Sequence, residues 1–110
     1  MATLQLADGT TRALEVADTR RSRRRGLLGR TSVDGGALLI TNCRSVHTFG
    51  MTFAIDVAHL SKAMRLLRVT TMIPGRVGAP VWRARHVLEA DAGSLAAWGL
   101  LVGQTITVSS

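Results

Sequence analysis

Residues 54–60, AIDVAHL, form the apolar stretch around which the rest of the chain is organised. A short turn, Ser61-Lys62-Ala63, separates them from a second strand-like run at residues 64–72, and Pro74-Gly75 ends that run. Stretches of this length that are bounded by turn residues are typical of β-strands. The middle of the chain is therefore predicted to form two strands that follow each other in sequence.

More strands are predicted on both sides of this pair. Residues 2–7 and 11–17 carry alternating polar and apolar side chains on either side of Asp8-Gly9, which is a hairpin signal. Three further strands are predicted at residues 37–41, 86–90 and 104–108. Many short strands with frequent glycine turns predict a mainly β fold, a sandwich or a barrel, rather than a parallel α/β sheet.

Two helical segments are predicted between the strands. Asp18 is expected to cap a helix that runs to about Leu28, because its side chain can accept a hydrogen bond from an early backbone N–H. Ser94 is expected to cap one helical turn that ends near Trp98. Only the first helix is long enough to cross a sheet, so the fold is expected to be all-β with a helical insertion.

The bulk composition limits the class of protein. A chain of 110 residues has room for one core, so residues 1–110 are expected to form a single domain. The one cysteine excludes an internal disulfide and fits a reducing compartment. No signal peptide pattern and no run of roughly 20 apolar residues is visible, so a soluble protein of the cytoplasm is expected.

The chain is strongly basic, with fourteen Lys and Arg residues against seven Asp and Glu residues. This charge favours anionic partners such as nucleic acid or an acidic membrane surface, although a bias toward arginine also arises from a GC-rich genome. The predicted helix holds the densest cluster: Arg20, Arg21, Arg23, Arg24 and Arg25. No aromatic side chains are interleaved with it, so base stacking has no support, and a solvated basic face is the alternative.

Residues 43–56, CRSVHTFGMTFAID, contain the residue types from which a catalytic site would be built. A thiolate at Cys43 would need the nearby imidazole of His47 to act as a nucleophile, but a lone cysteine at a strand end is more often a small buried residue. An enzyme would instead use His47 as a general base, oriented by Asp56 or Glu89. The catalytic candidates are therefore His47 and Asp56.

Asp56 and Glu89 lie inside apolar strands, where an unpaired carboxylate is costly. Because arginines are abundant, the simplest expectation is that both carboxylates are paired with arginines such as Arg23 or Arg30. The alternative is that these groups converge with His47 on a small polar or anionic ligand.

No metal or cofactor is predicted. Structural zinc would need four ligands at paired spacing, and the sequence has neither a second cysteine nor a close histidine pair. A looser set of His47, Asp56 and His86 requires that their strands be neighbours, and nothing in the spacing demands it. No glycine-rich nucleotide motif is present.

Several motifs in order resemble one bacterial family. Residues 23–30, RRRGLLGR, are similar to an R-x-x-G-L-M-x-R element, and residues 35–40, GGALLI, to the G-G-M-L-F strand after it. Residues 47–51, HTFGM, followed by Asp56, and residues 87–89, VLE, match two later elements. Together these motifs resemble the family called domain of unknown function 192, in its branch with a His-Thr-Phe-Gly-Met motif.

This resemblance spans residues 15–108 and implies a compact β-sandwich of jelly-roll type. It implies no activity, because the family is uncharacterised. The recurrent polar positions of the family fall on five residues of this chain: Arg23, Arg30, His47, Asp56 and Glu89. We therefore expect a small non-catalytic binding or accessory module with a polar pocket formed by these residues. A hydrolase-like enzyme with His47 as general base and a binder of anionic surfaces are the alternatives.

Overall fold

The computed structural model describes residues 2–109, and in this range the chain forms seven strands and two short helices. In chain order they are β1 (Ala2–Gln5), β2 (Thr11–Ala17), α1 (Arg20–Arg25), β3 (Ala37–Ile40), β4 (Ile55–Leu60), β5 (Leu66–Met72), β6 (His86–Asp91), α2 (Ser94–Ala97) and β7 (Thr107–Ser109). All strands belong to one sheet with the order β5-β4-β6-β3-β2-β1-β7. Neighbouring strands are antiparallel except β2 and β3, which are parallel and joined by the crossover that contains α1.

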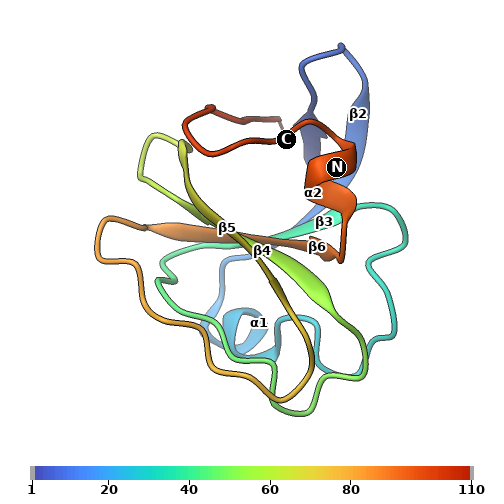
Figure 1. Ribbon diagram of the computed structural model, residues 1–110, viewed down its shortest axis with the longest axis vertical. Coiled ribbons are helices and arrows are strands. Elements are labelled where there is room, and N and C mark those ends of the chain that lie inside the picture. Colours follow the sequence, from blue (N-terminus) through green and yellow to red (C-terminus); the bar gives the residue numbers. More distant parts are fainter. Residues whose placement is uncertain (1, 110) are drawn as a thin grey trace.

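The sheet curls into a half-barrel, as Figure 1 shows. Two backbone hydrogen bonds join the start of β5 to the segment before β7, at opposite edges of the sheet. The N–H of Leu66 donates to the carbonyl of Gln104 (2.8 Å), and the N–H of Ile106 donates to the carbonyl of Met64 (3.0 Å). These bonds use the segment that was predicted to be the start of the last strand, so β7 itself begins only at Thr107. The predicted mainly β class, with one Arg-rich helix and a C-terminal helical turn, is confirmed.

The central strands separate two hydrophobic cores, because side chains alternate between the faces of a sheet. One face is covered by α2 and the β1–β7 side of the sheet, and the other by α1 and the long loops (Figure 1). The first core is rich in leucine and includes Leu39, Ala58, Leu60, Leu88, Ala90 and Leu95. The second includes Leu38, Ile40, Val46, Ile55, Val57 and Val87. Every residue of β4 is buried, because both faces of this strand are covered.

The ends of α1 differ from the prediction. Thr19, and not Asp18, is the N-cap: its hydroxyl accepts from the N–H of Ser22 while the Ser22 hydroxyl accepts from the N–H of Thr19, both at 3.0 Å. The helix ends at Arg25 and not near Leu28, because Gly26 adopts a positive φ of 49° that a side chain would disfavour. Because the helix ends here, the side chain of Leu27 points into the second core, and this residue is 2% exposed.

The capping prediction for α2 was also wrong. Gly93 occupies the N-cap position in a left-handed conformation, and Ser94 is the first helical residue. No side chain in the described part of the chain caps the helix. In residues 2–109, neither helix is long and apolar enough to cross a membrane.

Candidate functional site

The two buried acidic residues of the central strands lie on opposite faces of the sheet. Asp56 is paired in register with Ala90, and Glu89 with Val57, so the two carboxyl groups come from adjacent strands but alternate positions. Asp56 shares the face of Ala58 and Leu60, which belongs to the first core. Glu89 shares the face of Val57 and Val87, which belongs to the second core. The predicted convergence of Asp56 and Glu89 on one pocket is therefore wrong.

Asp56 is satisfied by hydrogen bonds and not by an arginine. The hydroxyl of Thr71, its cross-strand partner on β5, donates to Oδ1 at 2.7 Å. The backbone N–H of Leu95, in the first turn of α2, donates to Oδ2 at 3.1 Å. Asp56 is 3% exposed, so these two donors replace the water that an exposed carboxylate would bind. Its role in the structure is to hold α2 on the first face.

Glu89 has no such partners. It is 4% exposed, and within residues 2–109 its carboxyl group forms no hydrogen bond and no ion pair. Burial raises the pKa of this carboxyl group from 4.5 to about 7, because the charged form loses hydration. The predicted pairing of Glu89 with Arg23 or Arg30 is therefore wrong.

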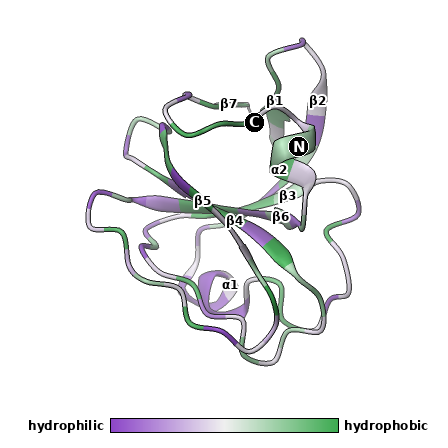
Figure 2. Ribbon diagram, in the orientation of Figure 1, coloured by the Kyte–Doolittle hydropathy of each residue, from purple (hydrophilic) through white to green (hydrophobic). Residues whose placement is uncertain are grey.

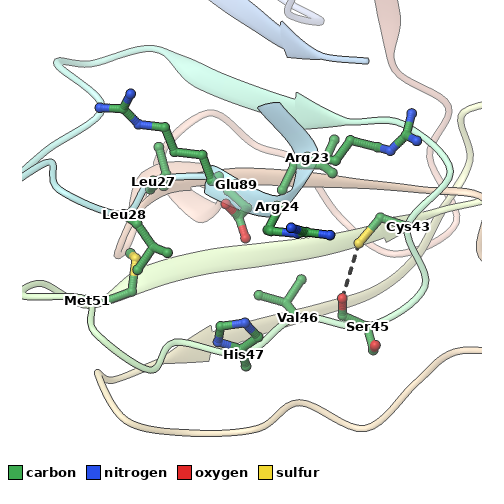
Figure 3. A pocket seen from close by; sticks show the side chains of 13 residues that line it. Arg23, Arg24, Leu27, Leu28, Cys43, Ser45, Val46, His47, Met51 and Glu89 are labelled. Atoms are coloured by element: carbon green, nitrogen blue, oxygen red, sulfur yellow. Dashed lines mark hydrogen bonds between the residues drawn. The ribbon is translucent and has the colours of Figure 1, made fainter. Parts of the chain in front are cut away.

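The carboxyl group of Glu89 faces a cavity of about 80 Å³ between α1 and the loop that follows β3. Figure 3 shows the carboxyl group in the middle of this space, with Leu28 and Met51 on one side and Cys43 on the other. The end of α1 lies directly above it: a Cβ atom added to Gly26 would be 3.7 Å from Glu89 Oε1. The apolar walls are Leu27, Leu28, Ile40, Val46 and Met51.

Three arginines of α1 line the cavity: Arg23, Arg24 and Arg25. Arg23 is half-buried and donates from Nη1 to the carbonyl of Asp18 at 3.0 Å, which directs part of its guanidinium away from Glu89. Figure 2 shows α1 as a hydrophilic helix against the sheet. Arg30 lies elsewhere, where it contacts Glu15 at 2.6 Å and Asp34 at 3.8 Å. Of the five residues predicted to form the pocket, the structure brings Arg23, His47 and Glu89 together and places Arg30 and Asp56 apart from them.

His47 reaches the cavity from an irregular segment that is fixed by its neighbour. Thr48 is fully buried, and its hydroxyl donates to the carbonyl of Ile73 (2.7 Å) and accepts from the N–H of Arg76 (2.8 Å). His47 itself is exposed and stacks on Phe49 with ring centroids 5.5 Å apart. Among residues 2–109 no carboxylate is bonded to its ring, so the predicted orientation of His47 by Asp56 or Glu89 is not formed.

Cys43 is half-buried and lines the cavity, so the interpretation as a plain core residue was incomplete. Its thiol donates to the carbonyl of Ser45 at 3.1 Å. Burial raises the pKa of the Cys43 thiol, and the nearby Glu89 adds to this effect while Arg23 opposes it. A thiol in this environment is kept in its protonated, weakly nucleophilic form.

The loose three-residue set of His47, Asp56 and His86 does not form. Within the described range 2–109, no three His, Cys, Asp or Glu side chains are grouped so that they could hold a metal ion. His86 instead accepts at Nδ1 from the backbone N–H of Asn42 at 3.2 Å.

Sequence reasoning did not identify the residues that shape the cavity. Gly26 forms its roof and the side chains of Leu28 and Met51 form its wall. All three lie in the motifs that carry the family resemblance, but nothing in those motifs indicates that they surround one cavity. The usable signal was Glu89 itself, an acidic residue in an apolar strand. It marks a buried carboxyl group but not what covers it.

Comparison with known proteins places the chain in an uncharacterised group. A 49-residue segment, 44% of this chain, is 41% identical to UPF0127 protein PH1112 of Pyrococcus horikoshii and covers 43% of that relative, which is less than two thirds of its length. A protein of unknown function from Novosphingobium aromaticivorans has a TM-score of 0.77 at 18% identity, over 99% of this chain and 83% of its own. A protein of Sinorhizobium meliloti, described as a candidate transcription regulator, has a TM-score of 0.75 at 18% identity, over 98% of this chain and 90% of its own.

At this identity the two solved structures show a shared fold and nothing about activity. The sequence model of the family DUF192, described as "Uncharacterized ACR, COG1430", matches residues 3–108. Because this match spans nearly the whole chain, the protein belongs to the DUF192 family.

Proposed function

We propose that the protein is a small non-catalytic binding module that holds a small polar or anionic ligand in the cavity above Glu89. One observation carries the proposal: within residues 2–109 the carboxyl group of Glu89, a residue that is only 4% exposed, has no hydrogen-bond partner and faces a cavity. A carboxyl group that is largely withdrawn from water without a protein partner is unfavourable, so a native structure that keeps one needs a reason. A ligand that supplies the missing hydrogen bond is such a reason.

The same cavity gives little support to covalent or general-base catalysis. Burial raises the pKa of the Cys43 thiol, which disfavours the nucleophilic thiolate. His47 stacks on Phe49 and lacks an orienting carboxylate in the described residues. A binding role requires only the shape and polarity that the cavity already has.

The proposal is tested by amide NMR with a panel of small probes: acetate, phosphate, methylguanidinium, acetamide and glycerol. At least one probe should shift the amide resonances of Gly26, Val46 and Glu89 in a saturable way. The Glu89→Leu variant lacks the carboxyl group and should lose that response, while the unchanged positions of its other amide resonances should show that it is folded. If no probe moves these resonances at tens of millimolar, the cavity is not a ligand site and the proposal is wrong.

A second candidate function is binding of an anionic surface, nucleic acid or acidic lipid, through α1. The observation that favours it is the exposure of Arg20, Arg21, Arg24 and Arg25, none of which forms an ion pair within residues 2–109. Binding to a fluorescent DNA 20-mer, or to vesicles with phosphatidylserine, should weaken steeply between 50 and 300 mM salt. Replacing these four arginines by glutamine should abolish it. Weak binding that ignores salt and the substitutions would eliminate this candidate.

We also propose a cytoplasmic location. The single cysteine is free and half-buried, which suits a reducing compartment. Fractionation of cells that produce the tagged protein at native level should recover it with cytoplasmic markers, and recovery in an oxidising compartment would contradict the proposal.

A further inference from the structure

The charges around the cavity are one-sided. Among residues 2–109, Glu89 is the only acidic residue that lines it, whereas α1 contributes Arg23, Arg24 and Arg25. None of these arginines forms an ion pair with another described residue. A positively charged ligand would be repelled on its way in, and a negatively charged one would be attracted. The mouth of the cavity therefore favours an anion.

The floor of the cavity can accept an anion only if Glu89 is neutral. Burial brings the pKa of Glu89 to about 7, so near neutral pH a large fraction of molecules carries the proton. A protonated carboxyl group donates one hydrogen bond, which an oxyanion accepts.

The other titratable groups around Glu89 do not replace this donor. Cys43 and His47 face the cavity from the loop after β3, and the thiol already donates to Ser45. On the same sheet face, Asp91 of β6 accepts from Ser32 and Val33, and β4 contributes the buried His59. β3 contributes only apolar side chains.

The size and walls of the cavity narrow the choice of anion. About 80 Å³ accommodates roughly five to eight water-sized groups, since one water needs about 10–15 Å³. The side chains of Leu28, Val46 and Met51 offer an apolar lining beside the polar floor. A carboxylate head with two or three carbons behind it fits both the volume and the lining better than a fully polar ion.

We propose that the ligand of this pocket is a short aliphatic carboxylate whose head group lies between the arginines of α1 and a protonated Glu89, so that binding takes up a proton. The inference rests on the proposed function. In the molecules where Glu89 is ionised, one proton moves from solvent to its carboxylate as the anion binds. No other bond forms or breaks.

The test is titration calorimetry with butyrate at pH 6, 7 and 8, each in two buffers of different ionisation enthalpy. Because only the protonated fraction binds, affinity should be about tenfold weaker at pH 8 than at pH 6. The buffer comparison at pH 8 should show uptake of nearly one proton per butyrate. The Glu89→Gln variant keeps a donor that cannot ionise, so it should bind butyrate with the same affinity at all three pH values.

The arginines are tested by a matched pair of double variants. Arg23→Gln with Arg24→Gln should weaken butyrate binding at least tenfold, whereas Arg20→Gln with Arg21→Gln, equal in charge but outside the cavity, should change it less than threefold. Equal losses in the two variants would mean a general charge effect and would overturn the head-group contact.

Other outcomes separate this inference from the proposed function. If butyramide or butylamine shifts the cavity amides and butyrate does not, the pocket binds ligands but the carboxylate assignment is wrong. Tighter binding at pH 8 than at pH 6, or phosphate bound more tightly than butyrate, also overturns it. If none of these probes nor the earlier panel binds, the proposed function fails together with the inference.

Discussion

Each face of the central sheet holds one buried acidic residue, and the two residues differ in their hydrogen bonding. On the first face, Asp56 is closed in by the hydroxyl of Thr71 and the backbone N–H of Leu95. On the second face, Glu89 is buried to nearly the same extent and has no hydrogen-bond partner within residues 2–109. The difference comes from the covering elements: α2 begins over Asp56 and presents backbone donors, whereas α1 ends over Glu89 and presents Gly26. A buried carboxyl group that is hydrogen-bonded by the protein thus has a structural role. One without protein donors remains available to a ligand.

The largest effect is expected from Asp56→Ala. It removes two hydrogen bonds to a carboxylate and leaves the N–H of Leu95 buried without an acceptor, which should cost about 4 kcal/mol of unfolding free energy. Urea unfolding at pH 7 measures it. Asp18→Ala, at an exposed residue whose side chain forms no hydrogen bond or ion pair within residues 2–109, is the control and should cost under about 0.5 kcal/mol. Similar losses in both variants would refute the structural role of Asp56.

Glu89→Gln should raise the free energy of unfolding, whereas Asp56→Ala lowers it. The folded protein holds a proton on Glu89 up to about pH 7, while the unfolded chain releases it near pH 4.5, so wild-type stability falls as pH rises between these values. At roughly 1.4 kcal/mol per pKa unit, the variant should gain up to about 3 kcal/mol at pH 8 and little at pH 4.

Thermal or urea unfolding of both proteins across this pH range checks the result. A loss of stability at pH 8 in the Glu89→Gln variant would mean that the carboxylate has a partner after all.

His59 extends the contrast, because it shares the face of Glu89 and, within residues 2–109, neither of its ring nitrogens forms a hydrogen bond of good geometry. Burial lowers its pKa below 6.5 and the charge of Arg68 adds to this, so wild-type stability should fall as pH drops below 6.5. The His59→Leu variant should have a free energy of unfolding about 1 kcal/mol higher than wild type at pH 7, and the difference should be larger at pH 5. A variant whose advantage does not grow between pH 7 and pH 5 would contradict this.

The smallest effect is expected from Thr71→Val, which removes one of the two donors to Asp56 and keeps the shape of the side chain. The loss should be about 1 kcal/mol in urea unfolding. In the Asp56→Ala background the same substitution should cost much less, because the two residues act through one bond. If the losses of unfolding free energy in the double variant simply add, the two residues do not act through a shared hydrogen bond.

Much of the fold was predictable because strand periodicity is local. Apolar runs bounded by turn residues identified the central strands, and every predicted strand forms. Only the second has the predicted ends; the others are shifted by one to three residues at one or both ends. The ends of α1 were missed because they depend on cap geometry: Ser22 completes the box with Thr19, and Gly26 takes a positive φ. The parallel pairing of β2 with β3 follows from the crossover, which periodicity does not report.

The candidate site was predictable only in part. Arg23, His47 and Glu89 do line one cavity, but Arg30 and Asp56 were assigned to it wrongly. Arg30 instead binds Glu15, fifteen residues away in sequence, and Asp56 accepts from the N–H of Leu95, thirty-nine residues away. Such partners are set by which segments cover which face, and no spacing in the sequence carries that information.

The sequence by itself determined that this chain folds as a mainly β protein, that an Arg-rich helix is inserted into it, and that two acidic residues are buried in its strands. Those properties follow from alternation and composition, which act over a few residues. Only the tertiary structure decided that Asp56 is satisfied and Glu89 is not. The reason is that a hydrogen bond forms over about 3 Å, so the fate of a buried carboxyl group depends on where distant segments lie to that accuracy.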